Sequence, residues 1–282
     1  MAVPTKTKKT TPAPIKYYLL FFNILSALGW SYLLFLTLTH LFNLDGASPS
    51  TTTAAPKSAA SALSRFLSSF PIFQSSGFAS ATFESRIPEA LKPLYRRSTT
   101  TYERLGTPTA IVQSLAVLEV VHVLLGFVRS PLGTTAAQVA SRLFLVWGIV
   151  EQFESVRSSP IYTTMLLSWS LTEVIRYSFY AFSLVGREPY PLLYLRYTTF
   201  FLLYPTGASS EAALIWASLP ASSPLPGWKA WVHGIWRPAD YGRAVLFVIW
   251  WPGLYVMYTY MIAQRRKVLG KGSVRVKGAK IS

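Results

Sequence analysis

The sequence predicts an all-α membrane protein, a bundle of six transmembrane helices. Of its 282 residues, 51% are hydrophobic and only 13% are charged. The apolar residues form long runs separated by short polar segments, and a helix needs about 17–25 such residues to cross a bilayer. Positive charge gathers at the two ends of the chain. The expected spans are 17–42, 107–128, 134–150, 161–185, 192–219 and 244–262.

The basic ends predict how the first and last spans are oriented. Lysines precede the run at 17–42, and a lysine- and arginine-rich stretch follows the last run. Because such residues favour the cytosolic side, we expect both termini there. Residues 1–16 read as a disordered cytosolic tail, 17–264 as the membrane domain and 265–282 as a basic cytosolic tail. No cleavable signal-peptide pattern precedes the first run, so we expect it to be retained.

The first connection, 43–106, is the longest. It opens with a low-complexity stretch rich in Ala, Ser and Thr. Such loops are usually functional or disordered. Apolar residues at 63–73 favour a loop that is tethered and rests in part on the bilayer surface.

Spans two to four each carry two polar residues spaced to share one helix face. The pairs are Glu119 with His122, Gln138 with Arg142, and Glu173 with Arg176. One interpretation is a buried hydrogen-bond and ion-pair network that holds the helices together. The other is a functional site, because ionisable residues inside a membrane are costly. The third span is short, and its inclusion depends on the other five needing a partner and on the resemblance described below.

The fifth span carries the strongest candidate site, Tyr204 and Glu211. In an ideal helix, residues seven apart return to nearly the same face, about 10 Å further along the axis. A substrate could lie between them. Pro205 lacks an amide donor and Gly207 is conformationally permissive, so we expect the helix to be bent or opened here.

Composition also excludes several classes of function. The chain has no cysteine and only three histidines, which excludes thiol chemistry and leaves no candidate metal site. No phosphate-binding Gly-rich loop precedes a helix. The net charge of +16 is typical of basic segments beside anionic lipid, so we expect no nucleic-acid partner.

Four stretches together resemble a known family. The run 193–211 contains ArgTyr…Phe…LeuTyrPro-x-Gly-x-x-x-Glu, and 118–131, 138–142 and 169–180 follow the same pattern in order and spacing. They resemble the very-long-chain (3R)-3-hydroxyacyl-CoA dehydratases, also called the protein-tyrosine-phosphatase-like A family. The resemblance covers roughly residues 17–267. It implies a six-span enzyme of the endoplasmic reticulum membrane, without a cofactor, in the third step of fatty-acid elongation.

The resemblance also assigns roles. It implies that Tyr204 and Glu211 are the catalytic pair. It places supporting, substrate-orienting residues at Glu119, Gln138, Arg142, Glu173, Arg176 and Gly207. The implied partners are a long-chain 3-hydroxyacyl-CoA substrate, the lipid bilayer and the other elongation enzymes, namely an elongase, a ketoacyl reductase and an enoyl reductase.

Dehydration of a 3-hydroxyacyl thioester needs a base for the C2 proton and an acid for the departing hydroxyl. Carboxylates have ordinary pKa values near about 4 and tyrosine near about 10. We therefore expect Glu211 to be the base and Tyr204 the acid, although the reverse assignment stays open. Two other interpretations also stay open: a non-catalytic membrane scaffold, and a small-molecule carrier.

Overall fold

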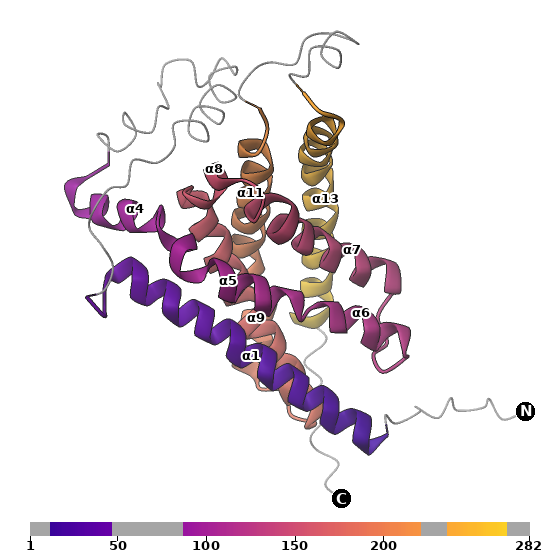
Figure 1. Cartoon of the computed structure of the whole chain (residues 1–282). Helices are drawn as coiled ribbons and strands as arrows, with labels where there is room; N and C mark the ends of the chain where they lie inside the picture. Colours follow the sequence, from indigo (N-terminus) through magenta and orange to yellow (C-terminus); the bar gives the residue numbers. More distant parts are fainter. Residues whose placement is uncertain (1–11, 47–86, 221–235, 270–282) are drawn as a thin grey trace, which may run out of the picture.

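The computed structural model describes residues 12–46, 87–220 and 236–269, and within them every regular element is a helix (Figure 1). The long helices are α1 (Ala13–Phe42), α9 (Pro160–Leu184), α11 (Phe200–Ala217) and α13 (Pro238–Leu269). The shorter ones are α4 (Lys92–Ser98), α5 (Thr101–Ser114), α6 (Val117–Leu124), α7 (Leu132–Leu143), α8 (Glu154–Arg157) and α10 (Tyr190–Arg196). A 3₁₀ turn η2 (Glu89–Leu91) precedes α4, and a π-helical segment η3 (Phe144–Val150) continues α7.

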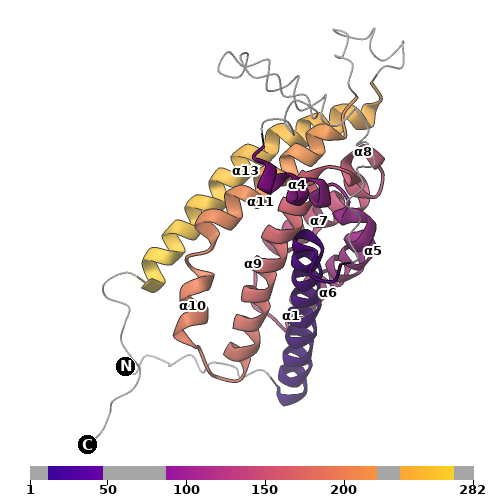
Figure 2. The ribbon, with the colours of Figure 1, turned by 90° about the vertical axis from the view of Figure 1, so that its left-hand side faces the viewer.

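Helix α9 lies at the centre of the bundle. It packs along α1 on one side and along α11 on the other, and α13 packs on the outer side of α11 (Figure 2). The core that these contacts bury includes Leu33, Leu105, Leu166 and Ile215. The site described below is built around α9 because the central helix can present side chains to several neighbours.

Local sequence explains where α9 begins and ends. The Ser159 hydroxyl accepts a hydrogen bond from the Ile161 amide at 3.3 Å, and Pro160 occupies the first turn, where its missing N–H costs nothing. At the other end Gly186 has φ +82°, and the Arg187 amide donates to the Phe182 carbonyl at 3.0 Å. A glycine in the left-handed region is the usual way to stop a helix.

Of the described residues, three helical segments are long and apolar enough to cross a membrane, judged by length and composition: Ala13–Phe42, Thr101–Leu124 and Pro238–Leu269. The coarse prediction of an all-helical membrane protein is therefore confirmed. Helices α9 and α11 are not among the three, and they carry Glu173 and Arg176, and Tyr204 and Glu211, respectively.

Several expected boundaries differ from the observed ones. The second helical segment begins at Thr101 and is tightened after Leu115, where the Ala116, Leu118 and Glu119 amides each donate to the carbonyl of the third preceding residue. The end of the predicted 43–106 loop is helical in η2, α4 and the start of α5. Its low-complexity part, with the apolar residues 63–73, lies outside the described residues, as do 1–11 and 270–282.

The expected opening at Pro205 is wrong, because α11 runs without interruption through Pro205 and Gly207. The chain breaks instead between α10 and α11, at residues 197–199. There the Arg265 guanidinium donates to the Tyr197 carbonyl at 2.7 Å. This contact satisfies an acceptor that a continuous helix would have paired with an amide.

Candidate active site

The Glu211 carboxylate is bound by two indole N–H groups from different helices. Trp169 Nε1 on α9 donates to Oε1 at 2.6 Å, and Trp250 Nε1 on α13 donates to Oε2 at 2.9 Å. Both donors are neutral, and no ion pair to Glu211 is found among the described residues. Each oxygen keeps a further lone pair, so the carboxylate is oriented but remains able to accept a proton.

Small residues bring α11 against α9. Gly207 is buried, and a Cβ added there would lie 3.5 Å from the Ser168 Cβ. Beside it, the Ser168 and Thr206 hydroxyls are 3.2 Å apart. Small and hydroxyl-bearing residues allow such close approach between helices in a membrane. Gly207 therefore acts in helix packing, which places Glu211 within reach of Trp169.

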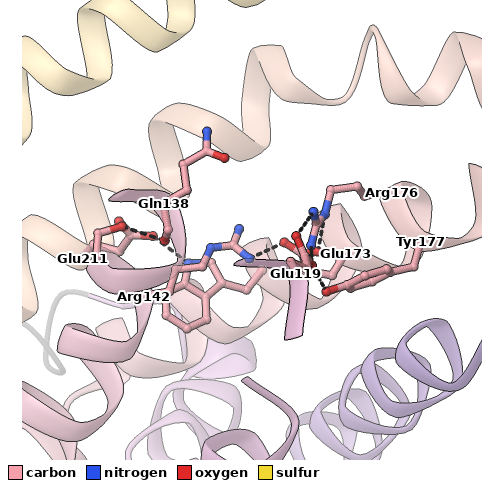
Figure 3. A network of polar contacts seen from close by, with 9 residues as sticks. Glu119, Gln138, Arg142, Glu173, Arg176, Tyr177 and Glu211 are labelled. Carbon is pink, nitrogen blue, oxygen red and sulfur yellow. Dashed lines mark hydrogen bonds and ion pairs between the residues drawn. The ribbon is translucent and has the colours of Figure 1, made fainter. Parts of the chain in front are cut away.

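An ion-pair network continues from Trp169 through three helices (Figure 3). The Arg142 guanidinium on α7 lies over the Trp169 ring, 5.1 Å from its centroid, and pairs with Glu173 on α9. Glu173 also accepts from Arg176 Nε at 2.6 Å. Arg176 in turn binds both oxygens of Glu119 on α6, at 2.6 and 2.9 Å. The prediction that Glu173 and Arg176 pair on one helix face is confirmed.

The charges in this network balance without Glu211. Two arginines face two carboxylates, and the Tyr177 hydroxyl also donates to Glu119. Glu173 is only 1% exposed, so its charge requires these partners. The arginines are occupied by Glu119 and Glu173, which leaves Glu211 as the carboxylate of the group held by neutral donors alone.

Tyr204 lies two turns before Glu211 on α11 and is half-buried. In the part of the chain that the structure describes, no hydrogen bond joins its hydroxyl to another group. A phenol in this state can donate to a substrate oxygen. The helix therefore carries a carboxylate acceptor and a phenolic donor at a spacing of seven residues.

Two predicted residues lie outside the network. Gln138 is exposed on α7, and Figure 3 shows its amide pointing away from the Arg142–Glu173 pair. The His122 ring does not join Glu119. It lies 2.9 Å from the Tyr18 hydroxyl and packs edge-on against Phe22, which links α6 to α1. We interpret His122 as a packing residue.

Sequence reasoning missed Trp169, Trp250 and Tyr177. Trp169 precedes Glu173 by four residues, so helical spacing alone placed it on the face of the network. Trp250 carried no such signal, because its partner lies on another helix. Among the described residues, no group of histidine, aspartate and glutamate is arranged to bind a metal ion.

Comparison with known proteins identifies the same family that the sequence motifs resemble. Residues 113–271 match the family described as protein tyrosine phosphatase-like protein, PTPLA. The chain is 44% identical over 175 residues to a probable very-long-chain (3R)-3-hydroxyacyl-CoA dehydratase of Schizosaccharomyces pombe, covering 62% of this chain and 79% of that protein. It is 41% identical over 174 residues to the dehydratase PASTICCINO 2 of Arabidopsis thaliana, covering 60% and 79%.

A human relative is more distant. The chain is 35% identical over 176 residues to very-long-chain (3R)-3-hydroxyacyl-CoA dehydratase 2 of Homo sapiens, covering 60% of this chain and 67% of that protein. No solved structure matches the chain.

Proposed function

The chain belongs to the protein tyrosine phosphatase-like PTPLA family, and from this premise we propose that it dehydrates very-long-chain (3R)-3-hydroxyacyl-CoA to trans-2-enoyl-CoA with Tyr204 and Glu211 as its proton-transfer pair. The reaction is the dehydration step of fatty-acid elongation. The observation that carries the site assignment is the Glu211 carboxylate, held by two neutral indole donors beside a balanced ion-pair network.

In the proposed mechanism Glu211 removes the proton from C2 of the substrate. Tyr204 donates its proton to the C3 hydroxyl, the C3–O bond breaks and water departs as the double bond forms. Glu211 then releases the C2 proton to solvent and the Tyr204 oxygen takes one up from solvent, which restores both groups. Two positioned proton-transfer groups are sufficient for this elimination, so the proposal requires no metal or redox cofactor.

The network has a positioning role in this proposal. Arg142 stacks on Trp169, and Glu173 fixes the guanidinium from the other side. The negative charge that develops on the thioester oxygen needs a donor, and Arg142 is the cation of the network that lies beside Trp169. Arg176 holds Glu173 and is itself held by Glu119, and Gly207 lies where α11 packs on α9. Gln138, one turn before Arg142, is available for substrate.

We also propose that residues 17–264 form six spans in the endoplasmic reticulum membrane with both termini in the cytosol. Figure 2 supports an even number of spans, because the start of α1, the α9–α10 connection and the end of α13 lie at the same end of the bundle. The basic stretches that precede the first span and follow Gln264 favour a cytosolic location for that end of the bundle. The elongase and the two reductases of the cycle are the proposed neighbours.

Protease treatment of sealed microsomes tests this topology. Tags at either terminus should both be digested from outside, because both ends lie on the cytosolic face. A tag placed in the loop between α11 and α13 should be protected until detergent is added. Protection of one terminal tag and digestion of the other would contradict the even number of spans.

Trp250→Phe should lower kcat about tenfold or more, because it removes an N–H donor to a charged acceptor and keeps an aromatic ring. KM should change little, since the indole contacts the carboxylate and is not assigned to the substrate. Trp251→Phe is the matched control: Trp251 is 45% exposed and is not one of the two indole donors to Glu211, so its loss should leave turnover unchanged. Equal kcat values for the two variants would show that the Trp250 hydrogen bond is not needed.

The function itself is tested by incubating the purified protein with 3-hydroxyacyl-CoA substrates of graded chain length and measuring trans-2-enoyl-CoA. Turnover is expected for long chains. A scaffold would give no product, and a carrier in vesicles would move substrate across the membrane without dehydrating it. Either result would contradict the proposal.

A further inference from the structure

Arg196, on α10, is a cation without an acidic partner. None of the ion pairs among the described residues includes it. Its Nη2 donates to the Tyr180 hydroxyl at 3.2 Å, while its Nη1 is buried and finds no acceptor in the described part of the chain. A buried N–H of a charged group is costly to leave without a hydrogen bond.

Aromatic rings hold the guanidinium in place. Its Cζ lies 4.6 Å from the centroids of both Phe179 and Tyr180 and 5.8 Å from that of Tyr197. Ring faces attract a cation, but they offer no lone pair to Nη1 and carry no net charge. The packing therefore fixes the direction of Arg196 without neutralising it.

A second arginine meets the same segment. Arg265, near the end of α13, donates from Nη1 to the Tyr197 carbonyl at 2.7 Å and to the Thr198 hydroxyl at 2.8 Å. It makes no ion pair with any described residue either. Arg265 thus binds the backbone of Tyr197, and the ring of the same residue lies 5.8 Å from the Arg196 Cζ, at the break between α10 and α11. Arg266 and Lys267 follow Arg265 directly, so the local charge is positive.

We propose that Arg196 and Arg265 form a binding site for a phosphate group. Guanidinium groups match phosphate oxygens in geometry and charge, and an arginine whose spare donor is buried is suited to a dianionic acceptor. Under the proposed function, on which this assignment of the source rests, the phosphate belongs to the CoA portion of the substrate. A phospholipid headgroup offers the same chemistry from a second source.

The position of the site along the chain fits a CoA head. Arg196 precedes Tyr204 by eight residues and Glu211 by fifteen, and the break at residues 197–199 lies between Arg196 and both of them. CoA carries its phosphates at the far end of an extended pantetheine arm from the thioester. In Figure 2, α10 and the end of α13 lie together at the end of the bundle where we expect the cytosol. The head would bind there while the acyl chain enters the bundle.

Tyr180 connects this site to the ion-pair network. Its ring lies 4.6 Å from the Arg196 Cζ and 5.9 Å from the Arg176 Cζ. The phosphate site and the network are therefore neighbours on the same face of α9.

The test compares two unreactive thioesters by calorimetry on the full chain in detergent. Hexadecanoyl-CoA carries the phosphates, and hexadecanoyl-pantetheine lacks them. For Arg196→Gln we expect the Kd of hexadecanoyl-CoA to rise about tenfold or more, while that of hexadecanoyl-pantetheine stays unchanged. Arg196→Lys should recover only part of the affinity, because lysine keeps the positive charge but lacks the two parallel N–H donors of the guanidinium group.

Arg187→Gln is the matched control. Arg187 lies in the connection between α9 and α10 and is exposed. Its substitution therefore removes the same charge from a side chain that is not held by the aromatic rings around Arg196. It should leave both affinities unchanged. If Arg196→Gln weakens both thioesters equally, the residue acts on folding and the phosphate site is overturned.

Phosphorus content identifies the source. Arg196→Gln protein that retains less phospholipid than wild type, with the same affinity for hexadecanoyl-CoA, would assign the phosphate to a lipid. Unchanged affinity and unchanged phospholipid would overturn the site. Neither thioester is turned over, so binding is measured independently of dehydration. A protein that binds hexadecanoyl-CoA through Arg196 but does not dehydrate 3-hydroxyacyl-CoA would contradict the proposed function alone. A protein that dehydrates its substrate, and whose affinity for hexadecanoyl-CoA does not depend on Arg196, would contradict this site alone.

Discussion

Glu211→Gln and Tyr204→Phe should each reduce dehydration about 10²–10⁴-fold, because each keeps the side-chain shape and removes one proton-transfer group. The Glu211→Gln amide can still accept a hydrogen bond from one indole, so α11 should stay in place. Binding of hexadecanoyl-CoA should remain within a few-fold of wild type. The measurement is conversion of 3-hydroxyacyl-CoA to trans-2-enoyl-CoA, with thioester binding followed separately.

The double variant shows whether the two groups act as a unit. If Tyr204 and Glu211 serve one proton-transfer sequence, the double variant should be scarcely slower than the slower single variant, since such effects are not additive. Tyr255→Phe and Glu154→Gln are controls on exposed residues of the same types and should leave the rate unchanged. A Glu211→Gln protein that dehydrates at the wild-type rate would end the assignment.

Much of the site could be predicted from the sequence because its signal is local. A glutamate in an apolar run can be recognised without knowing how the helix is rotated. Tyr204 lies seven residues before Glu211, so helical spacing places both on nearly the same face. The Glu173–Arg176 pair is three residues apart on one helix, so its contact needed no knowledge of the fold. In contrast, the partners of Arg142 and Glu119 depend on how α6, α7 and α9 rotate against one another.

The two indole donors show a different limit. Trp169 and Trp250 are counted among the hydrophobic residues of the composition, yet their N–H groups hold the carboxylate. Only the packing of α13 against α11 brings Trp250 to Glu211. Amphipathic side chains of this kind carry their polar function in one atom, which composition does not reveal.

The fifth span opens at residues 197–199 and not at Pro205 for a physical reason. Pro205 lies in the second turn of α11, where it removes one backbone hydrogen bond and the rest of the helix continues. At the break itself Arg265, from the far end of the chain, binds the Tyr197 carbonyl, and the Thr199 hydroxyl donates to the Leu195 carbonyl at 2.9 Å. Side-chain donors from elsewhere in the fold thus decide where the helix ends.

Glu173→Gln should destabilise the protein by about 3–5 kcal/mol, because removing one partner of a buried ion pair leaves an uncompensated charge. Glu173 serves both Arg142 and Arg176, and Glu119 alone would remain to balance them. At roughly 2–4 °C for each kcal/mol, the thermal midpoint in detergent should fall by about 10 °C. Dehydration should also fall, since Arg142 loses the contact that orients it beside Trp169.

The double variant Glu173→Gln with Arg142→Met separates stability from function. It removes the whole pair and keeps the Arg176–Glu119 pair, so no buried charge is left without a partner. Most of the lost thermal stability should return, because replacing a buried pair by neutral groups is often close to neutral. Activity should stay low, since the positioned guanidinium is gone. A double variant that regains activity together with stability would show that Arg142 serves packing alone, and the network would then be structural.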